Sequence, residues 1–345
     1  MGKNGGKVGL HPDEITTAEV LKEKGYATAM AGKWHLGSKA PFLPTYQGFD
    51  TYFGIPYSND MNREKLPIML DEKVIEIKPD QSLLTKRYTD FAIDFINSKD
   101  DDEPFFVYLA HSMPHVPIFA SDNFKGTSMG SVYGDVIEEI DYGVGQILNK
   151  IKNLGLSDKT IIVFTSENGP WLEMGKDGGT AGILRGGKGS TWEGGIRVPT
   201  VIWGPGYIKP GVVDDIGTSM DLFSTFSFLA DVEIPNDRII DGNNLSHVFK
   251  SLSKSPTENF FYYWGAELMA VRYKSYKLHL KLHEAYDGKP MKVLKTPFLY
   301  NLDTDPSEKN NIYEDNLDVL DKIDEIIKKH KNDLIIAKDL LIDLK

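Results

Sequence analysis

Charged, amide and imidazole side chains follow several predicted strands, at the points where those strands end. They are Lys33 and His35, His111 and His115, and Glu167 and Asn168, and Lys188 lies in the Gly-rich loop that begins at Arg185, before the strand expected at residues 199–203. Ligands of open α/β sheets bind beyond the carboxyl ends of the strands. We therefore expect these side chains to converge on one edge of one sheet.

The residue types in this set suit a divalent cation and a tetrahedral oxyanion ester. The oxygens of Glu167 and Asn168 are hard ligands of the kind that Ca²⁺ and Mg²⁺ prefer. The ammonium groups of Lys33 and Lys188 can neutralise the charge that develops as an ester bond breaks. An imidazole such as that of His115 can give a departing alkoxide its proton near neutral pH.

Each of these residues alone also has a structural interpretation, and two other kinds of site are disfavoured. A Lys or His in a glycine-flanked turn is more often solvated than catalytic, and Ser-Glu-Asn-Gly is a good turn sequence. Residues 182–189 resemble a phosphate-binding loop, but Gly189 stands where such a loop requires Ser or Thr. The spacing of His111 and His115 would suit zinc only on a helix, which Pro114 disfavours.

The composition limits the classes of partner and of chemistry. The chain of 345 residues has a formal net charge of −11 and no long basic block, which argues against nucleic acid or an anionic membrane as its main partner. No apolar stretch approaches the ~20 residues of a membrane span, and the N-terminal sequence has no apolar signal core. The absence of cysteine excludes disulfides, thiolate zinc sites and thiol catalysis.

The apolar periodicity predicts alternating helices and strands. Thr16 and Glu19 form a capping-box pattern at the start of a short helix. Further helices are expected over residues 84–96, 136–151 and 222–229, and strands over residues 26–31, 105–110, 160–165 and 199–203. The β-branched run at 160–165 is typical of a buried strand. This order predicts an α/β fold with a mainly parallel sheet sandwiched by helices.

A change of composition near residues 251–256 predicts a boundary between two domains. The first, residues 1–252, would be the α/β domain. The second, residues 253–345, would be a smaller α+β subdomain with an antiparallel sheet, since residues 260–264, 269–273 and 277–282 are short, aromatic-rich runs with tight spacing. Residues 317–345 are expected to form one helix or a pair of helices.

Several motifs along nearly the whole chain resemble those of the type I sulfatase family, in the alkaline-phosphatase-like superfamily, and the arylsulfatase A branch is most similar. The matching runs are Gly25-Tyr26 with 31–37 (AGKWHLG), 47–50 (QGFD), 54–60 (GIPYSND), 165–170 (TSENGP), 187–189 (GKG) with 192–199 (WEGGIRVP), and 299–302 (LYNL) with 305–308 (DPSE). The lysine–histidine run at 31–37 is highly specific for that family.

The resemblance implies a hydrolase that cleaves a small-molecule sulfate ester. It assigns the binding of the sulfate group and assistance to the leaving group to Lys33, His35, His115 and Lys188. Ser58 would lie near the substrate, and we place His111 and Arg185 with it as substrate-binding residues. Glu167 and Asn168 would be ligands to Ca²⁺, with Mg²⁺ possible.

The sequence also departs from the family pattern. Members begin with a strand that bears two adjacent metal-binding aspartates, followed by a Cys/Ser-x-Pro-x-Arg motif whose first residue becomes the formylglycine nucleophile. This sequence starts about where that motif would end, and Glu167 stands where the family usually has Asp. We therefore expect weakened cation binding, no formylglycine and slow hydrolysis. A missing strand would leave unpaired sheet edges, so we also expect a homo-oligomer.

Two alternatives stay open beside sulfate ester hydrolysis. One is a non-catalytic member of the family, or a fragment, that only binds anions. The other is a phosphate or carboxylic ester hydrolase that uses water or a serine as its nucleophile. Ser58, Ser112 and Ser166 are the candidate serines, although none lies in a Gly-x-Ser-x-Gly elbow.

Overall fold

The computed structural model describes residues 8–100 and 102–336. The contacts between Cα atoms group the described residues into two units, residues 8–160 with 219–246 and residues 161–218 with 247–336. The domain boundary after residue 252 stays a prediction about the organisation of the sequence. None of the helices within the described ranges combines the length and the apolar character needed to cross a membrane.

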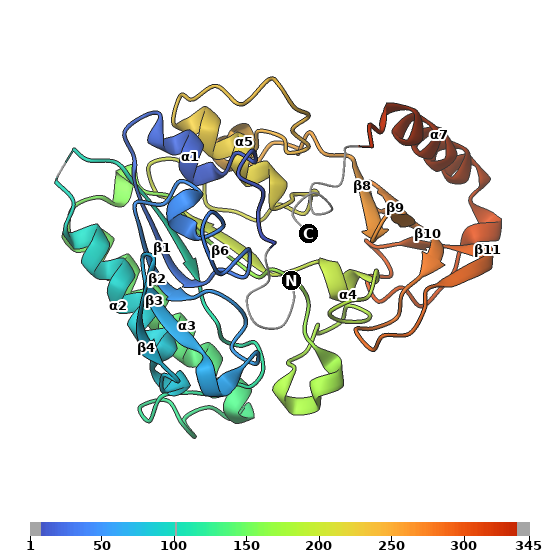
Figure 1. Ribbon diagram of the computed structural model, residues 1–345. Coiled ribbons are helices and arrows are strands. Elements are labelled where there is room, and N and C mark those ends of the chain that lie inside the picture. The colour runs from blue at the N-terminus through green and yellow to red at the C-terminus, as the bar shows by residue number, and fades with distance from the viewer. Residues whose placement is uncertain (1–7, 101, 337–345) are drawn as a thin grey trace. The chain divides into compact units, whose positions relative to one another are not determined.

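The first unit is built on a five-stranded sheet (Figure 1). One inner strand pairs in parallel with both of its neighbours, and the two strands beyond one of those neighbours are antiparallel. The order in the sheet is β4 (Lys73–Ile77), β3 (Pro67–Leu70), β2 (Thr51–Ile55), β1 (Ala27–Lys33) and β5 (Phe105–Ala110). The predicted α/β fold with a mainly parallel sheet is confirmed, with an antiparallel hairpin added at one side.

β1 is buried on both faces, as is typical of a strand that pairs in parallel with both neighbours. Successive side chains of a strand point to opposite faces. Met30 of β1 belongs to an apolar cluster with Ala18 and Tyr52, whereas the next residue, Ala31, belongs to a cluster on Leu84 and Tyr88. The strand β1 is therefore fixed from both sides, and its carboxyl end has a defined position in the unit.

Helices cover the sheet of the first unit (Figure 1). α2 packs against β1 and β5, and α3 packs against α2. The predicted capping box of the first helix is confirmed, because Thr16 Oγ1 accepts from the Glu19 N–H at 3.2 Å and the Glu19 carboxylate accepts from the Thr16 N–H at 2.7 Å. The helices of this unit are α1 (Thr17–Lys22), α2 (Leu84–Asn97), α3 (Ser131–Asn153) and α5 (Met220–Leu229).

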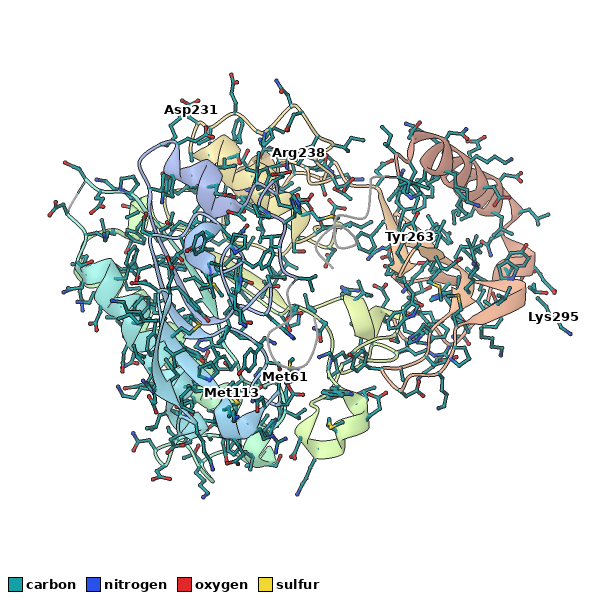
Figure 2. All side chains as sticks on the ribbon, viewed as in Figure 1. Met61, Met113, Asp231, Arg238, Tyr263 and Lys295 are labelled. Carbon is teal, nitrogen blue, oxygen red and sulfur yellow. The ribbon has the colours of Figure 1, made fainter. Side chains whose placement is uncertain are left out.

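The segment that carries α5 returns to the beginning of the chain. Lys24 forms an ion pair with Asp231 at 3.0 Å, and Arg238 Nη1 donates to the backbone carbonyl of Asp13 at 2.7 Å. Figure 2 labels Asp231 and Arg238 on this segment. These contacts join residues more than 200 positions apart, so residues 219–246 belong to the first unit.

The second unit holds two antiparallel sheets. The smaller sheet pairs β6 (Ile162–Thr165) with β7 (Thr200–Trp203), and the short helix α4 (Glu193–Ile196) precedes β7. The larger sheet has the order β11 (Lys292–Asn301), β10 (Tyr276–Leu282), β9 (Glu267–Tyr273) and β8 (Asn259–Trp264), and α7 (Leu317–Asp333) packs on it. The predicted C-terminal antiparallel sheet and helix are thereby confirmed. The part of the predicted tail beyond residue 336 lies outside the described residues.

Short elements complete both units. α6 (Ser246–Ser251) lies where the chain passes from the first unit to the second.

Lys295 of the edge strand β11 extends into solvent (Figure 2), and such a charged side chain discourages edge-to-edge pairing. The 3₁₀ helices are η1 (Pro44–Tyr46), η2 (Arg63–Lys65), η3 (Gln81–Leu83), η4 (Ser157–Lys159), η5 (Leu172–Asp177) and η6 (Tyr313–Asp315).

Two expectations for the run at residues 160–165 are wrong. This run forms β6, but in the described part of the chain β6 pairs with β7 and not with the five-stranded sheet. The strand is also not fully buried, because Phe164 is 42% exposed. A β-branched run favours a strand but does not reveal which strand it pairs with or how many of its faces are covered.

The close pairing of β1 and β5 generates a stability prediction. Gly32 has a φ of 113°, and a Cβ added there would lie 1.8 Å from the carbonyl oxygen of Ala110. Gly32→Ala should therefore lower the free energy of unfolding by more than about 2 kcal/mol. Gly145→Ala on α3, where an added Cβ meets nothing within 4 Å, should raise it by about 0.5–1 kcal/mol. Urea unfolding of both variants measures this, and equal stabilities would contradict the strand geometry.

Candidate active site

In the first unit, four of the predicted site residues follow neighbouring strand ends. Lys33 is the last residue of β1, and His35 lies two residues further on. The parallel register pairs Gly32 with Ala110, so β5 ends level with β1. His111 and His115 follow β5 directly. The structure therefore brings these four residues to one edge of one sheet, as the sequence predicts for them.

The turn after β1 holds His35 in an unusual backbone conformation. His35 has a φ of 60°, a left-handed conformation that is uncommon outside glycine. Its N–H donates to the carbonyl of Pro56 at 3.2 Å, and the preceding Trp34 is buried with its indole N–H donating to the carbonyl of Phe42 at 2.7 Å. Backbone strain of this kind persists only where the surrounding structure fixes it, and it clusters at functional sites.

The imidazole of His115 has a defined tautomer. Its Nδ1 lies 2.7 Å from the backbone carbonyl oxygen of Val116. Because a carbonyl can only accept, Nδ1 must carry the proton, and in the neutral ring Nε2 then holds the lone pair. The hydroxyl of the buried Ser58 lies 3.5 Å from the same Nδ1. The geometry leaves Nε2 as the atom through which the neutral ring can accept a proton.

Asn59 fixes the loop that carries His115. The side chain of Asn59 is fully buried, and its Nδ2 donates to Gln81 Oε1 at 3.1 Å and to the carbonyl of Pro117 at 3.0 Å. This amide thus connects the turn after β2 to the loop after β5. Asn59 was not among the residues expected in the site, and the only sequence feature that indicates it is its position beside Ser58 in the run at 54–60.

His111 differs chemically from the other imidazoles of the first unit. Both of its ring nitrogens are buried and have no hydrogen-bond partner among the described residues. Its ring lies 6.4 Å from the ring of Tyr88, between centroids. Burial lowers the pKa of His111 to about 4. His111 is therefore neutral at pH 7, and it can offer an anion a hydrogen bond but no positive charge.

In the second unit, the predicted metal ligands and the second lysine lie on adjoining loops. The N–H of Gly169, which follows Glu167 and Asn168, donates to the carbonyl of Gly195 at 3.1 Å. A Cβ at Gly169 would lie 1.8 Å from a backbone oxygen of α4, so this turn requires glycine. The N–H of Lys188 donates to the carbonyl of Pro170 at 2.7 Å. The turn after β6 and the Lys188 loop are therefore held together.

The donor set for a cation is partial. The oxygens of Glu167 and Asn168 have the hard character that suits Ca²⁺ or Mg²⁺. However, no group of three or more His, Cys, Asp or Glu that could hold a metal ion occurs in the portion of the chain that the structure describes. Glu167 and Asn168 can therefore supply only part of the six to eight oxygen ligands that Ca²⁺ typically takes.

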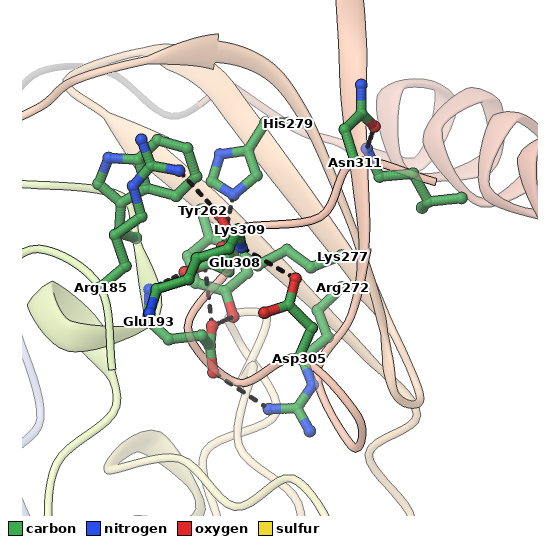
Figure 3. A network of polar contacts seen from close by, with 12 residues as sticks. Arg185, Glu193, Tyr262, Arg272, Lys277, His279, Asp305, Glu308, Lys309 and Asn311 are labelled. Atoms are coloured by element: carbon green, nitrogen blue, oxygen red, sulfur yellow. Dashed lines mark hydrogen bonds and ion pairs between the residues drawn. The ribbon is translucent and has the colours of Figure 1, made fainter. Parts of the chain in front are cut away.

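Arg185 is engaged in holding the Lys188 loop. Its guanidinium carbon lies 3.6 Å from the ring centroid of the buried Trp192. Its Nη1 donates to the backbone carbonyl of Glu308 at 2.8 Å. These contacts fix the start of the loop that carries Lys188 (Figure 3). That Arg185 also binds substrate stays a prediction.

A buried network of charges anchors α4 to the larger sheet of the second unit (Figure 3). Glu193, Lys277 and Glu308 are each at most 1% exposed. Lys277 Nζ lies 2.9 Å from Glu193 Oε1 and 3.2 Å from Glu308 Oε1, and the Glu193 N–H donates to Glu308 Oε2 at 2.7 Å. Burial raises the pKa of Glu193, but Lys277, Tyr262 and Arg272 together outweigh burial and bring the pKa down to about 2.

Neutral groups complete the network. The hydroxyl of Tyr262 donates to Glu193 Oε1 at 2.8 Å. Burial lowers the pKa of His279 to about 4 although Glu308 opposes the shift. The neutral His279 places Nε2 2.7 Å from Glu308 Oε1, where it donates a hydrogen bond. Glu193 Oε1 and both oxygens of Glu308 therefore accept hydrogen bonds, and Glu193 Oε2 lies 3.6 Å from Arg272 Nη1, which makes the buried charge tolerable.

Both parts of the chain match models of known protein families. The model of the C-terminal region of aryl-sulfatase matches residues 255–345, and the Sulfatase model matches residues 2–232. The chain therefore belongs to the sulfatase family.

Individual relatives agree with this assignment. The chain is 38% identical over 294 residues to an arylsulfatase of Hemicentrotus pulcherrimus, which covers 80% of this chain and 53% of the relative. It is 35% identical over 344 residues to human arylsulfatase A, which covers 88% of this chain and 68% of the relative. The PsFucS1 sulfatase of Pseudoalteromonas sp. superposes with a TM-score of 0.87 at 25% identity, over 95% of this chain and 75% of that one. The chain thus spans about half the length of the first of these relatives.

The buried network predicts a large effect for one lysine of β10 and a small effect for another. Lys277→Met should lower the free energy of unfolding by about 3–5 kcal/mol, because it removes the cation between two buried carboxylates and leaves only the more distant Arg272 beside Glu193. Lys281→Met, on the same strand as Lys277, removes a solvent-exposed pair with Glu267 of β9 and should have a much smaller effect. Denaturant unfolding at pH 7 measures both, and equal losses would contradict the network.

The ion pair of Glu193 and Lys277 makes the free energy of unfolding depend on pH. The pKa of Glu193 is lowered from 4.5 to about 2 in the folded protein. Its contribution to stability is therefore present above pH 4.5 and is lost as the pH falls toward 2. In Lys277→Met this part of the acid dependence should become smaller, because only Tyr262 and Arg272 then oppose the effect of burial on the pKa of Glu193. Denaturant unfolding between pH 2 and pH 7 measures the dependence in both proteins.

Proposed function

We propose that this protein hydrolyses sulfate esters in the manner of an arylsulfatase, with Lys33, His35, His115 and Lys188 acting on the sulfate group. The observation that carries the proposal is the placement of Lys33, His35 and His115 at one edge of one sheet in a member of the sulfatase family. Ser58, His111 and Arg185 are proposed to contribute to substrate binding. The substrate class is a small-molecule sulfate ester.

Water is the nucleophile that we propose. Its oxygen forms a bond to sulfur while the ester S–O bond breaks, which yields an alcohol or phenol and sulfate. His115 Nε2 takes the proton of the attacking water, and the imidazolium of His35 gives a proton to the departing oxygen. The ammonium groups of Lys33 and Lys188 neutralise the charge that develops on the sulfate oxygens.

The contacts of the three candidate serines favour water over a serine nucleophile. Ser58 faces the Nδ1 of His115, which donates to Val116 and so cannot accept the serine proton. Ser112 is buried, with its hydroxyl 3.1 Å from that of Tyr88. The hydroxyl of Ser166 donates to the backbone carbonyl of Asn168 at 3.0 Å. None of these contacts activates a hydroxyl for attack.

The cation and the oligomeric state are further parts of the proposal. Glu167 and Asn168 would contribute oxygen ligands to Ca²⁺ or Mg²⁺, and a bound cation would polarise the ester oxygens. Self-association is supported by β5, because β5 is an edge strand of the five-stranded sheet and pairs with a strand on one side only within the described ranges. The net charge of −11 disfavours nucleic acid as a partner.

A second candidate function is anion binding without turnover. It is supported by the presence of Lys33 and Lys188, whose ammonium groups can bind sulfate or phosphate whether or not an ester bond is then broken.

Turnover of 4-nitrophenyl sulfate separates the two functions. Lys33→Ala and Lys188→Ala should each lower kcat/KM by about 100-fold or more, because each removes a cation from the transition state. The matched controls Lys39→Ala and Lys176→Ala remove exposed lysines from the same two units and should leave kcat/KM unchanged. The measurement is the release of nitrophenol under saturating Ca²⁺.

Other outcomes distinguish the remaining candidates. Thermal stabilisation by sulfate without any turnover would establish anion binding alone. Turnover of 4-nitrophenyl phosphate or acetate, without turnover of the sulfate, would establish a different ester hydrolase.

A further inference from the structure

Two aromatic rings flank the side chain of Lys188 in the second unit. Its Nζ lies 5.0 Å from the ring centroid of Trp171 and 5.6 Å from that of Tyr286. The two rings meet edge to face, with centroids 5.5 Å apart and planes at 78°. The negative face of an aromatic ring attracts an ammonium at such distances. The rings thus form a corner that contains the lysine head group.

The segment that carries Trp171 is hydrogen-bonded to the lysine's own backbone. The N–H of Lys188 donates to the carbonyl of Pro170 at 2.7 Å, and the N–H of Trp171 donates to the carbonyl of Gly178 at 3.1 Å. These hydrogen bonds hold the backbone of Trp171 close to the backbone of Lys188.

The segment that carries Tyr286 is connected to the Lys188 loop on the other side. The Nδ1–H of His283 donates to the carbonyl of Gly189 at 2.6 Å, and the N–H of Thr191 donates to the carbonyl of His283 at 3.2 Å. The ring of His283 is itself stacked on Trp264, with centroids 3.6 Å apart. A Cβ at Gly189 would meet the backbone of Tyr286 at 2.9 Å, so the two segments are in close contact.

A ring contact suits a cation that has to bind an anion. The ammonium of lysine sits on a flexible four-carbon stem, and its direction is not fixed by the backbone alone. A cation–π contact restricts the position of the ammonium but requires no particular N–H direction. The N–H groups can therefore turn toward the oxygens of a sulfate while the nitrogen keeps its place.

We propose that Trp171 and Tyr286 are positioning residues that hold the ammonium of Lys188 where the sulfate group of the substrate binds. The proposal rests on the proposed function, because it assigns to the rings the task of placing a lysine that contacts sulfate. Both residues act through Lys188 and do not contact the reacting atoms.

A double-mutant cycle between Tyr286 and Lys188 tests the proposal. Tyr286 is 52% exposed, so its ring can be removed with little effect on the thermal midpoint. Tyr286→Leu should weaken the binding of inorganic sulfate and lower kcat/KM by about threefold to thirtyfold. The matched variant Tyr286→Phe keeps the ring and should stay within about twofold of the wild type. Isothermal calorimetry with sodium sulfate gives the binding constants.

The Lys188→Ala background decides whether the ring acts through the lysine. There, Tyr286→Leu should change sulfate binding and kcat/KM by no more than about twofold. Equal losses in both backgrounds would overturn the positioning role and leave the proposed function standing. A Tyr286→Phe variant as impaired as Tyr286→Leu would also overturn the positioning role. If Lys188→Ala binds no sulfate, this comparison of the two Tyr286 variants is the deciding test. A wild-type protein that binds no sulfate would overturn the proposed function itself.

Discussion

The second unit depends on the burial of one lysine between two carboxylates. An unpaired charge in a protein interior is very unfavourable, so Lys277 cannot be buried unless Glu193 and Glu308 lie beside it. Glu193 begins α4, directly after the Lys188 loop, and Glu308 follows β11. The pairing therefore fixes the loop with its lysine against the strands of the larger sheet. A Gly-rich loop that would otherwise be mobile gains a defined position from charges that do not touch the substrate.

In the first unit the corresponding constraint is the register of two parallel strands. Gly32 opposite Ala110 sets β1 and β5 level, and the residues that follow each strand emerge at the same edge. Trp34 then fixes the loop after β1 by burying its indole, and Asn59 connects the loop after β5 to the turn after β2 through a buried amide. Both units thus use buried groups to orient exposed loops, which is the usual division between a rigid scaffold and functional loops.

The sequence predicts those parts of the fold whose causes are local. The helical spacing of apolar residues locates α2 and α3, the Thr16–Glu19 pattern locates the start of α1, and the lysine–histidine run at 31–37 identifies the family. The partners of β6 could not be predicted, because strand pairing depends on which edges are available in three dimensions. The Glu193–Lys277 pair could not be predicted either, since its members are 84 residues apart and neither belongs to a charged motif.

We propose that Lys33, His35, His115 and Lys188 act on one sulfate group. A crystal structure of the protein with bound sulfate tests this claim most directly. The account predicts a single sulfate ion whose oxygens accept hydrogen bonds from Lys33 and Lys188, with His115 Nε2 directed at the same ion. A sulfate ion that contacts only one of the two lysines, or neither of them, would contradict the proposal.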